Sequence, residues 1–355
     1  IATGNVILLQ NDQKIKADRV EYVKDPKSKA VSYRAMGNVE IIDSVRTALC
    51  ELASYHAKSE ETILNQRPKI ISEDRTIKGD QIRLNYTDQI LNKIFIPKNA
   101  YITSITSGYD QLKIDSSNTL KSYEDKMSSK VLNGFFKNGN LDSLRLIGMA
   151  STTYHLFEDS LYKGNNLTSG DTIIMRFDEK DLNDIIVDGG SQGEYVPNKK
   201  TNDSKFPLVY SAERIEYLLK TETTKLIGNA KAKHENTDLS AGFIEVNWPT
   251  RILNAFPKQP NDSINQFVKP TIIEKGRDPM VGNQMTYNLD TKKGKINYGK
   301  TKADDGFYKG REIRNESDKT IYIKNSIFTT CDLDTPHFHF ESNKMKIIQD
   351  DVVIA

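Results

Sequence analysis

The residues best suited to chemistry lie near the end of the chain, in CDLDTPHFHF at 331–340. This stretch holds Cys331, Asp332, Asp334, His337 and His339. Residues two apart on a β-strand point to the same face, and metal sites use histidines at that spacing. A third and fourth ligand at defined spacing are missing from the sequence. We therefore expect no metal centre here and interpret the histidines as surface or packed side chains.

The other candidate catalytic groups are adjacent carboxylates, such as Asp304-Asp305 and Asp350-Asp351. Neighbouring residues on a strand face opposite sides, so these pairs are poor acid/base couples. The sequence also lacks the serine-elbow, HExxH, phosphate-loop and dinucleotide-binding motifs. We predict that the protein is not an enzyme and needs no cofactor.

Composition limits the kind of fold. Charged residues make up 28% and apolar residues 37% of the 355 residues, and the mean hydropathy is −0.58. Such a polar chain favours a thin structure in which each strand buries one face. The 50 basic and 48 acidic residues leave a net charge of +2 and form no long single-sign blocks, which argues against nucleic-acid binding.

No stretch approaches the roughly 20 apolar residues of a membrane-spanning helix. The two cysteines, Cys50 and Cys331, cannot form a disulfide framework and lack zinc-site spacing. They could be buried apolar residues, pair with each other, or pair with absent parts of the chain. We interpret both chain ends as cut, so a missing signal peptide says nothing about compartment.

Apolar residues alternate with polar ones along most of the chain, which predicts short strands with one buried face. The clearest segments are NVILLQ, KIKADRVEY, TIKGDQIRLNY, DTIIMRF, RIEYLL, FIEVNW and TIYIKN.

A two-part phrase recurs through the chain. The first part is a small residue, a Gly-containing pair and an apolar alternation, at 2–6, 35–39, 146–150 and 226–230. The second is ADRVEY at 17–22, GDQIRLNY at 79–86 and SAERIEY at 211–217, with VGNQMTY at 281–287 as a looser copy. Its closing tyrosines, together with Tyr55, are separated by 33, 31, 131 and 70 residues, close to multiples of 33.

A unit of about 33 residues is one hairpin or one V-shaped rung, which buries too little to fold alone, so we expect the units to stack. Gly-Asn tolerates positive φ, so we expect it to form the turns. We expect the acid of the second part to lie at a strand start, within reach of solvent.

Two Pro-containing polar stretches, 195–207 and 254–270, are candidate linkers. The first gives the better boundary, so we predict domains at 1–200 and 201–355.

One face of the stacked strands is predicted to form an apolar trough, open or closed. An open trough would accept acyl chains, since each buried methylene gains roughly 0.8 kcal/mol. The predicted lining residues are Val6, Leu8, Ile15, Val20, Tyr22, Val39, Ile41, Ile82, Leu84, Ile215, Tyr217, Ile244, Val246, Met285 and Tyr287.

The repeated phrases resemble the OstA family of lipopolysaccharide-transport proteins. The resemblance rests on ATGNVILLQNDQKIKADRVEY, AMGNVEI, LIGMASTTYH and LIGNAKAKHENTDLSAGFIEV. It implies an all-β, elongated β-jellyroll or β-taco stack of OstA-type repeats, in one run or as two consecutive jellyroll segments.

The resemblance also implies a function and its partners. Lipopolysaccharide acyl chains would slide along the apolar groove, without catalysis, on their way across the periplasm to the outer membrane. The partners would be lipopolysaccharide and other transport proteins, joined by edge-strand pairing. The protein would be periplasmic and associated with the outer membrane.

A second, local resemblance joins GNQMTYNLDTKKGKI and the following IYIKNSIFTTCDLDTPHFHFESNKMKII to LptD-type proteins, where this segment leads into the outer-membrane barrel. Thr329-Thr330-Cys331 matches the T-T-C triplet, whose cysteine forms a disulfide with the barrel in that family. The barrel, whether the chain's own C-terminal region or a separate chain, is therefore a further implied partner. Cys50 matches no family position, which leaves the disulfide pattern open.

Two other functions remain open. A polysaccharide-binding or polysaccharide-cleaving β-solenoid would also repeat short strands, although the period near 33 and the single Trp248 weigh against it. A purely structural envelope scaffold would show neither lipid binding nor turnover.

Overall fold

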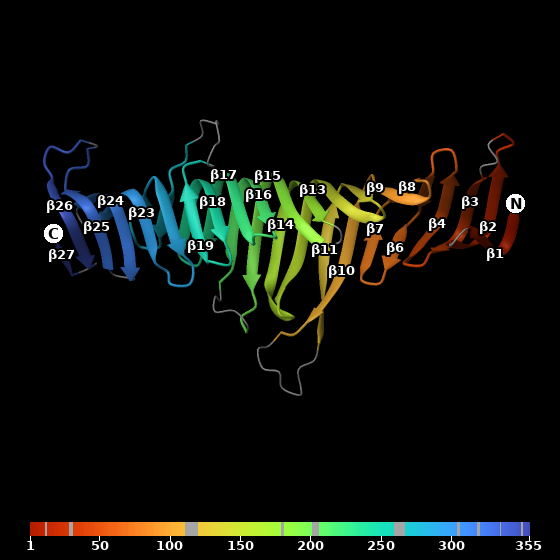
Figure 1. Cartoon of the computed structure of the whole chain (residues 1–355), viewed down its shortest axis with the longest axis horizontal. Coiled ribbons are helices and arrows are strands. Elements are labelled where there is room, and N and C mark those ends of the chain that lie inside the picture. Colours follow the sequence, from red (N-terminus) through yellow and green to blue (C-terminus); the bar gives the residue numbers. More distant parts are fainter. Residues whose placement is uncertain are drawn as a thin grey trace. The chain divides into compact units, whose positions relative to one another are not determined.

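The protein is an all-β structure, as the alternation predicted. The computed structural model describes residues 1–10, 13–27, 31–110, 120–178, 181–200, 206–258, 267–303, 306–317, 320–333, 335–348 and 351–355. Within these ranges the chain forms 27 strands and no helix (Figure 1). Hence no helix in the described chain could span a membrane.

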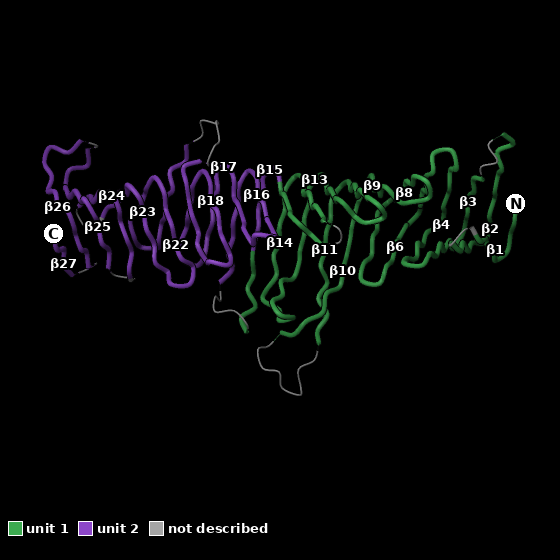
Figure 2. Tube along the Cα trace, viewed as in Figure 1, with its two compact units in different colours: residues 1–187, 195–205 green, residues 188–194, 206–355 purple. Residues whose placement is uncertain are grey.

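The strands belong to two compact units (Figure 2), and most of them pair antiparallel with their neighbours in the chain. Unit 1 holds Ile1–Val187 and Tyr195–Lys205, and unit 2 holds Asp188–Glu194 and Phe206–Ala355. The strands of unit 1 are β1 (Ala2–Gln10), β2 (Gln13–Lys24), β3 (Val31–Ile42), β4 (Arg46–His56), β5 (Glu61–Asn65), β6 (Lys69–Ser72), β7 (Arg75–Lys78), β8 (Gln81–Thr87), β9 (Ile90–Ile96), β10 (Ala100–Gly108), β11 (Lys121–Ser129), β12 (Val131–Lys137), β13 (Asn140–Glu158) and β14 (Leu161–Asp178).

Unit 2 continues the same pattern. Its strands are β16 (Leu208–Leu218), β17 (Thr223–His234), β18 (Thr237–Asn247), β19 (Ile252–Phe256), β20 (Thr271–Glu274), β21 (Met280–Val281), β22 (Gln284–Asn288), β23 (Gly294–Ala303), β24 (Gly306–Ser317), β25 (Thr320–Thr329), β26 (Phe340–Ile348) and β27 (Val352–Ile354).

The division between the units falls inside β15 (Asp181–Pro197), which contributes residues to both. The first predicted linker, 195–207, therefore begins within a strand. Residues 201–205 of that linker and 259–266 of the second lie outside the described residues. That 1–200 and 201–355 fold as separate domains stays a prediction.

The Gly-Asn pairs are not turns, which corrects the prediction from sequence. Gly37 and Asn38 have φ of 74° and 46° but lie in the middle of β3. The register of β3 against β4 shifts between Met36 and Val39, which marks a β-bulge. Gly228-Asn229 in β17 repeats the arrangement, with φ of 78° and 47° and a shift between Ile227 and Ala230. Two successive left-handed residues thus bend the strand, which then continues.

The tight hairpins that reverse the chain use other residues. Asp88-Gln89 joins β8 to β9 and Asn138-Gly139 joins β12 to β13, and all four residues have positive φ. Positive φ at both central residues is the geometry of the type I′ turn, which matches the twist of paired strands.

Candidate functional site: the apolar interior

The Gly-Asn bends of β3 and β17 are each held by an acid of the repeated phrase. Asn38 donates its side-chain amide to Asp18 on the neighbouring strand, with 3.0 Å between Nδ2 and Oδ2. In unit 2, Asn229 donates to Glu213 at 2.6 Å. Both acids are exposed and lie in mid-strand rather than at a strand start as predicted. The acid therefore fixes the left-handed asparagine of the next strand.

The glycine before each asparagine gives the acid room. A Cβ added at Gly228 would lie 2.5 Å from Oε2 of Glu213, and one at Gly37 would clash with the Asp18 carboxylate. At Gly148-Met149 the asparagine is replaced by methionine, and the facing residue is Lys130 instead of an acid. The bend therefore needs a glycine where a neighbouring side chain crosses the strand.

The bend folds a strand onto itself, as β16 shows directly. Tyr210 and Tyr217 lie on either side of the irregularity between Ser211 and Arg214. Seven residues of straight strand would span about 23 Å, yet the two hydroxyl oxygens are 2.8 Å apart in a buried hydrogen bond. The two halves of β16 therefore face each other, and we call the space between such facing halves the apolar interior.

Tyr33 marks the corresponding interior of unit 1. Its ring stacks on Tyr55 with centroids 5.5 Å apart. Burial, and to a lesser degree the nearby Tyr86 and Tyr55 hydroxyls, raise the pKa of Tyr33. Burial also raises the pKa of the Cys50 thiol to about 11, so this cysteine stays protonated and unreactive near neutral pH.

Most of the predicted lining residues do lie in this interior. Eleven of them are buried, namely Ile15, Val20, Val39, Ile41, Ile82, Leu84, Ile215, Tyr217, Ile244, Val246 and Met285. Val6, Leu8 and Tyr287 are half-buried. Tyr22 is 62% exposed, although it follows Val20 at the same-face spacing, because it lies near the end of β2. That these residues bind lipid stays a prediction.

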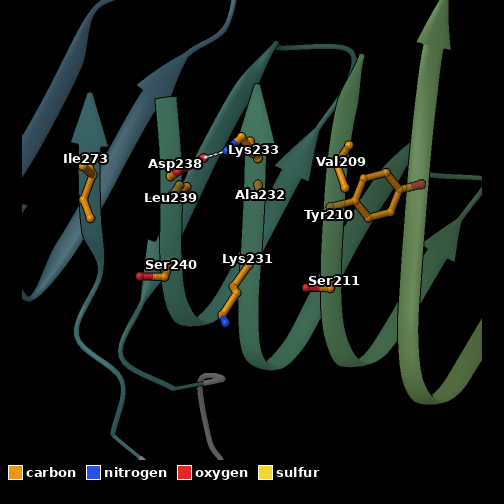
Figure 3. A pocket seen from close by; sticks show the side chains of 10 residues that line it. All are labelled: Val209, Tyr210, Ser211, Lys231, Ala232, Lys233, Asp238, Leu239, Ser240 and Ile273. Atoms are coloured by element: carbon orange, nitrogen blue, oxygen red, sulfur yellow. Dashed lines mark ion pairs between the residues drawn. The ribbon is translucent and has the colours of Figure 1, made fainter. Parts of the chain in front are cut away.

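The interior is packed, so the side chains themselves occupy the predicted trough. Ile15, Ile82, Ile215 and Ile244 have no exposed surface. Two depressions on the surface of the described chain include none of the predicted lining residues. The larger, of about 320 Å³, is lined chiefly by side chains that alternate with interior ones on β16, β17 and β18, among them Val209, Lys231 and Asp238 (Figure 3).

One stretch of the interior is polar, which the sequence reasoning missed. Beyond the bend in β13, Thr152 is buried, and Asn166 and Thr168 are buried on β14, the strand paired with it. Asn166 donates to the Tyr154 hydroxyl at 2.9 Å and to the Thr168 hydroxyl at 3.3 Å. Hydrogen bonds among Asn166, Tyr154 and Thr168 thus allow polar side chains to be buried at this place.

Further interior residues come from strands whose copies of the repeat are degenerate. Their alternation alone could have identified them, as TIYIKN does for Ile321 and Ile323. The largest fully buried members outside the predicted set are Leu64, Ile96, Leu132, Leu146, Ile173, Ile313 and Ile323.

The histidines at 337 and 339 do not lie on one face of a strand, as their spacing predicted. His337 and His339 lie in the connection between β25 and β26, not on a strand. His337 Nδ1 is 3.5 Å from the Cys331 sulfur, whereas His339 Nε2 is 3.0 Å from Glu341. Asp334 lies outside the described residues, and elsewhere in the described chain no three His, Cys, Asp or Glu side chains gather as metal ligands.

The two cysteines lie in different units, and both thiols are free. Cys50 is buried but Cys331 is partly exposed. Backbone N–H groups of His337 and Leu333 lower the pKa of the Cys331 thiol below its usual value. Cys331 is therefore the more reactive of the two.

Comparison with known protein families finds a match in the first part of the chain. Residues 1–90 match the family model described as LptA/(LptD N-terminal domain) LPS transport protein. No curated protein sequence matches the chain. A similar solved structure is LptH, the LptA homologous periplasmic component of the lipopolysaccharide transport device of Pseudomonas aeruginosa. It is 14% identical, with a TM-score of 0.33, over 42% of this chain and 93% of LptH.

The family match covers the first Gly-Asn bend, the ADRVEY phrase and its partner strands. The match contains two of the four segments on which the resemblance was based, ATGNVILLQNDQKIKADRVEY and AMGNVEI. Residues 1–90 are therefore similar to the LptA/LptD N-terminal domain family of lipopolysaccharide-transport proteins.

Proposed function

We propose that this protein carries lipopolysaccharide across the periplasm to the outer membrane, without catalysis, holding the acyl chains between the facing halves of its bent strands. The observation that supports it most is the apolar interior, which each unit forms from side chains of successive strands. The family match over residues 1–90 supports the substrate class.

Acyl chains enter this interior by parting the facing halves at their bends. The exchange replaces contacts between apolar side chains with contacts to apolar methylenes, so little packing energy is lost. Each methylene that leaves water gains roughly 0.8 kcal/mol. The bulges serve as the hinge because they already interrupt the strand ladder.

Two places on the protein are proposed to bind its partners, namely the edge strand β1 and the thiol of Cys331. In the described residues β1 pairs with β2 alone, and Ile7 and Leu9 of β1 are exposed. This edge would take a strand from a neighbouring transport protein. The partly exposed Cys331 would pair with the outer-membrane barrel.

Equilibrium binding of the full chain to three ligands tests the function. Intact lipopolysaccharide should bind, whereas its deacylated polysaccharide and a uronic-acid polymer should bind at least about tenfold more weakly, since a few buried methylenes are worth that much. Equal binding of deacylated polysaccharide would instead support the polysaccharide-binding alternative.

A matched pair of variants tests whether lipopolysaccharide contacts the interior side of β1. Leu8 faces the interior opposite Ile15, while its neighbour Ile7 faces outward opposite Lys16 and is 58% exposed. Leu8→Ala should weaken lipopolysaccharide binding and Ile7→Ala should not. Charged substitutions at the packed positions are unsuitable, because an unpaired charge at Ile215 would unfold the unit.

A further inference from the structure

A buried hydrogen bond between two tyrosines closes the apolar interior of unit 2 at β16. Tyr210 lies two residues after the first residue of this strand, and Tyr217 lies one residue before its last. Each is therefore within two residues of the free end of its half of β16, and the bend between Ser211 and Arg214 lies between them. Their hydroxyl oxygens are 2.8 Å apart, and both side chains are buried. The bond thus joins the two halves across the interior.

At the corresponding positions of β18 the interior holds apolar side chains instead. Following the register from β16 through β17 to β18, Val246 takes the place of Tyr217 and Leu239 takes the place of Tyr210. Both are buried. The hydrogen-bonded pair is therefore a local feature of β16, and it is not required wherever two halves of a strand meet.

The two kinds of closure differ in what it costs to open them. Replacing a buried hydrogen-bonded pair by apolar groups of the same shape changes stability little, so packing alone does not require the tyrosine hydroxyls. Apolar side chains that part expose their surface to water and recover nothing in return. Hydroxyls that part exchange the bond between them for bonds to water. The halves of β16 therefore open at a smaller cost than those of β18.

The ring of Tyr210 is positioned by the strand beside it. Figure 3 shows the ring turned toward the neighbouring strand, and a Cβ added at Gly193 of β15 would lie 2.2 Å from ring atoms of Tyr210. A glycine leaves room there for the close approach of the ring. The glycine thereby allows the ring to lie where its hydroxyl reaches Tyr217.

Unit 1 places a tyrosine of the repeated phrase in a similar position. Tyr86 closes GDQIRLNY as Tyr217 closes SAERIEY. Tyr86 lies near the end of β8, which is joined through β5 to the second half of β4, whereas Arg46 lies in the first half of β4, which pairs with β6. Burial raises the pKa of the Tyr86 hydroxyl, and the nearby Arg46 guanidinium partly offsets this rise. In this unit also, a tyrosine therefore lies close to a polar group of the opposite half.

We propose that the hydrogen bond between Tyr210 and Tyr217 is a latch that holds the two halves of β16 together and parts when acyl chains enter between them. The inference rests on the proposed function. The bend serves as the hinge, and the latch lies between the halves that the hinge joins. Tyr217 ends a copy of the repeated phrase, and its hydroxyl, which a phenylalanine lacks, thereby has a role in opening the interior.

Stopped-flow uptake of a fluorescent long-chain fatty acid by the full chain tests the latch. At saturating fatty acid the uptake rate is limited by opening of the protein. Tyr210→Phe and Tyr217→Phe should each raise this rate about fivefold, the effect of losing one buried hydrogen bond between uncharged groups. The double variant should be no faster than either single variant, since both substitutions remove the same bond. The control is Tyr298→Phe, at an exposed tyrosine of the same unit, which should leave the rate unchanged.

Equilibrium binding of lipopolysaccharide to the same proteins separates the latch from the carrier function. If lipopolysaccharide binds but the single variants take up fatty acid at the wild-type rate, or the double variant multiplies the two single effects, the latch is wrong and the carrier function stands. If the rates change as expected but lipopolysaccharide binds none of the proteins, the latch stands and lipopolysaccharide is not the cargo. If neither ligand binds, both claims fail. Urea unfolding followed by Trp248 fluorescence verifies that each variant is folded.

Discussion

At the scale of single residues, carboxylates act in this protein by fixing their neighbours. Asp18 and Glu213 each hold the asparagine of an adjacent bend. Asp80 does the same for Asn99, whose φ is 55°, accepting its amide at 3.0 Å. The sequence predicted that these acids lie at strand starts, which is correct for Asp80, directly before β8, and wrong for Asp18 and Glu213. It did not predict their contacts, because the asparagine that each acid meets is about 16 to 20 residues away.

The ion pairs of Glu312 predict that its contribution to stability depends on pH. Its contacts with Lys295, Lys324 and Arg314 lower the pKa of its carboxyl to about 2. A carboxyl whose pKa is lower in the folded state stabilises the fold above its unfolded pKa, and that stabilisation is lost as the pH falls. Glu312→Gln should therefore lower the free energy of unfolding most near pH 7 and progressively less below about pH 4.5.

Urea denaturation at several pH values, followed by the fluorescence of Trp248, the single tryptophan, measures the free energy of unfolding of unit 2. Glu316→Gln is the control, because Glu316 forms an ion pair with Lys293 at 3.0 Å on the surface. A pH-independent difference between wild type and Glu312→Gln would show that its ion pairs contribute nothing.

At the scale of elements, the alternation predicted the strands and their buried faces, but not how the strands bend. KIKADRVEY and AMGNVEI became β2 and β3 as expected. Gly-Asn was assigned to turns because two left-handed residues also make a type I′ hairpin. The prediction of left-handed residues at Gly-Asn was therefore correct, but the prediction of a turn there was wrong. Whether the chain reverses or continues depends on which other strand it pairs with.

Replacing a bend glycine tests this element directly. Gly228→Ala adds a side chain at φ of 78° and places Cβ 2.5 Å from Glu213 Oε2. Gly276 has φ of 82° but nothing within 4 Å of an added Cβ. Gly276→Ala should cost about 1 kcal/mol, the strain of the left-handed residue, and Gly228→Ala about 2–3 kcal/mol, since Glu213 must also move.

Trp248 fluorescence during urea unfolding reports both variants, since both glycines lie in unit 2. Equal losses for Gly228→Ala and Gly276→Ala would mean that the contact with Glu213 does not hold the bend.

At the scale of the whole molecule, both units are built by stacking one kind of bent strand. Each strand contacts chiefly its neighbours in the sheet, so stability is a sum over neighbouring strands. This explains why the period near 33 residues could be recognised although several copies are degenerate, since a copy needs only an interior face and a bend.

The sequence predicted which residues form the candidate site but not how tightly they pack. Period-two alternation placed Ile15, Ile82 and Ile215 correctly in the interior. It could not show that the interior is packed, because that depends on the facing half of each strand, as the contact between Tyr210 and Tyr217 reveals.

Site-specific photo-crosslinking to lipopolysaccharide tests the acyl-chain interior most directly. A benzophenone amino acid is placed at Leu8 in unit 1 and Tyr287 in unit 2, which are half-buried and face the interior opposite Ile15 and Leu253. The controls carry it at the adjacent residues Ile7 and Thr286, which face outward. The account predicts lipid capture at Leu8 and Tyr287 and little at Ile7 and Thr286, and capture at the outward positions alone, or equally at all four, would contradict it.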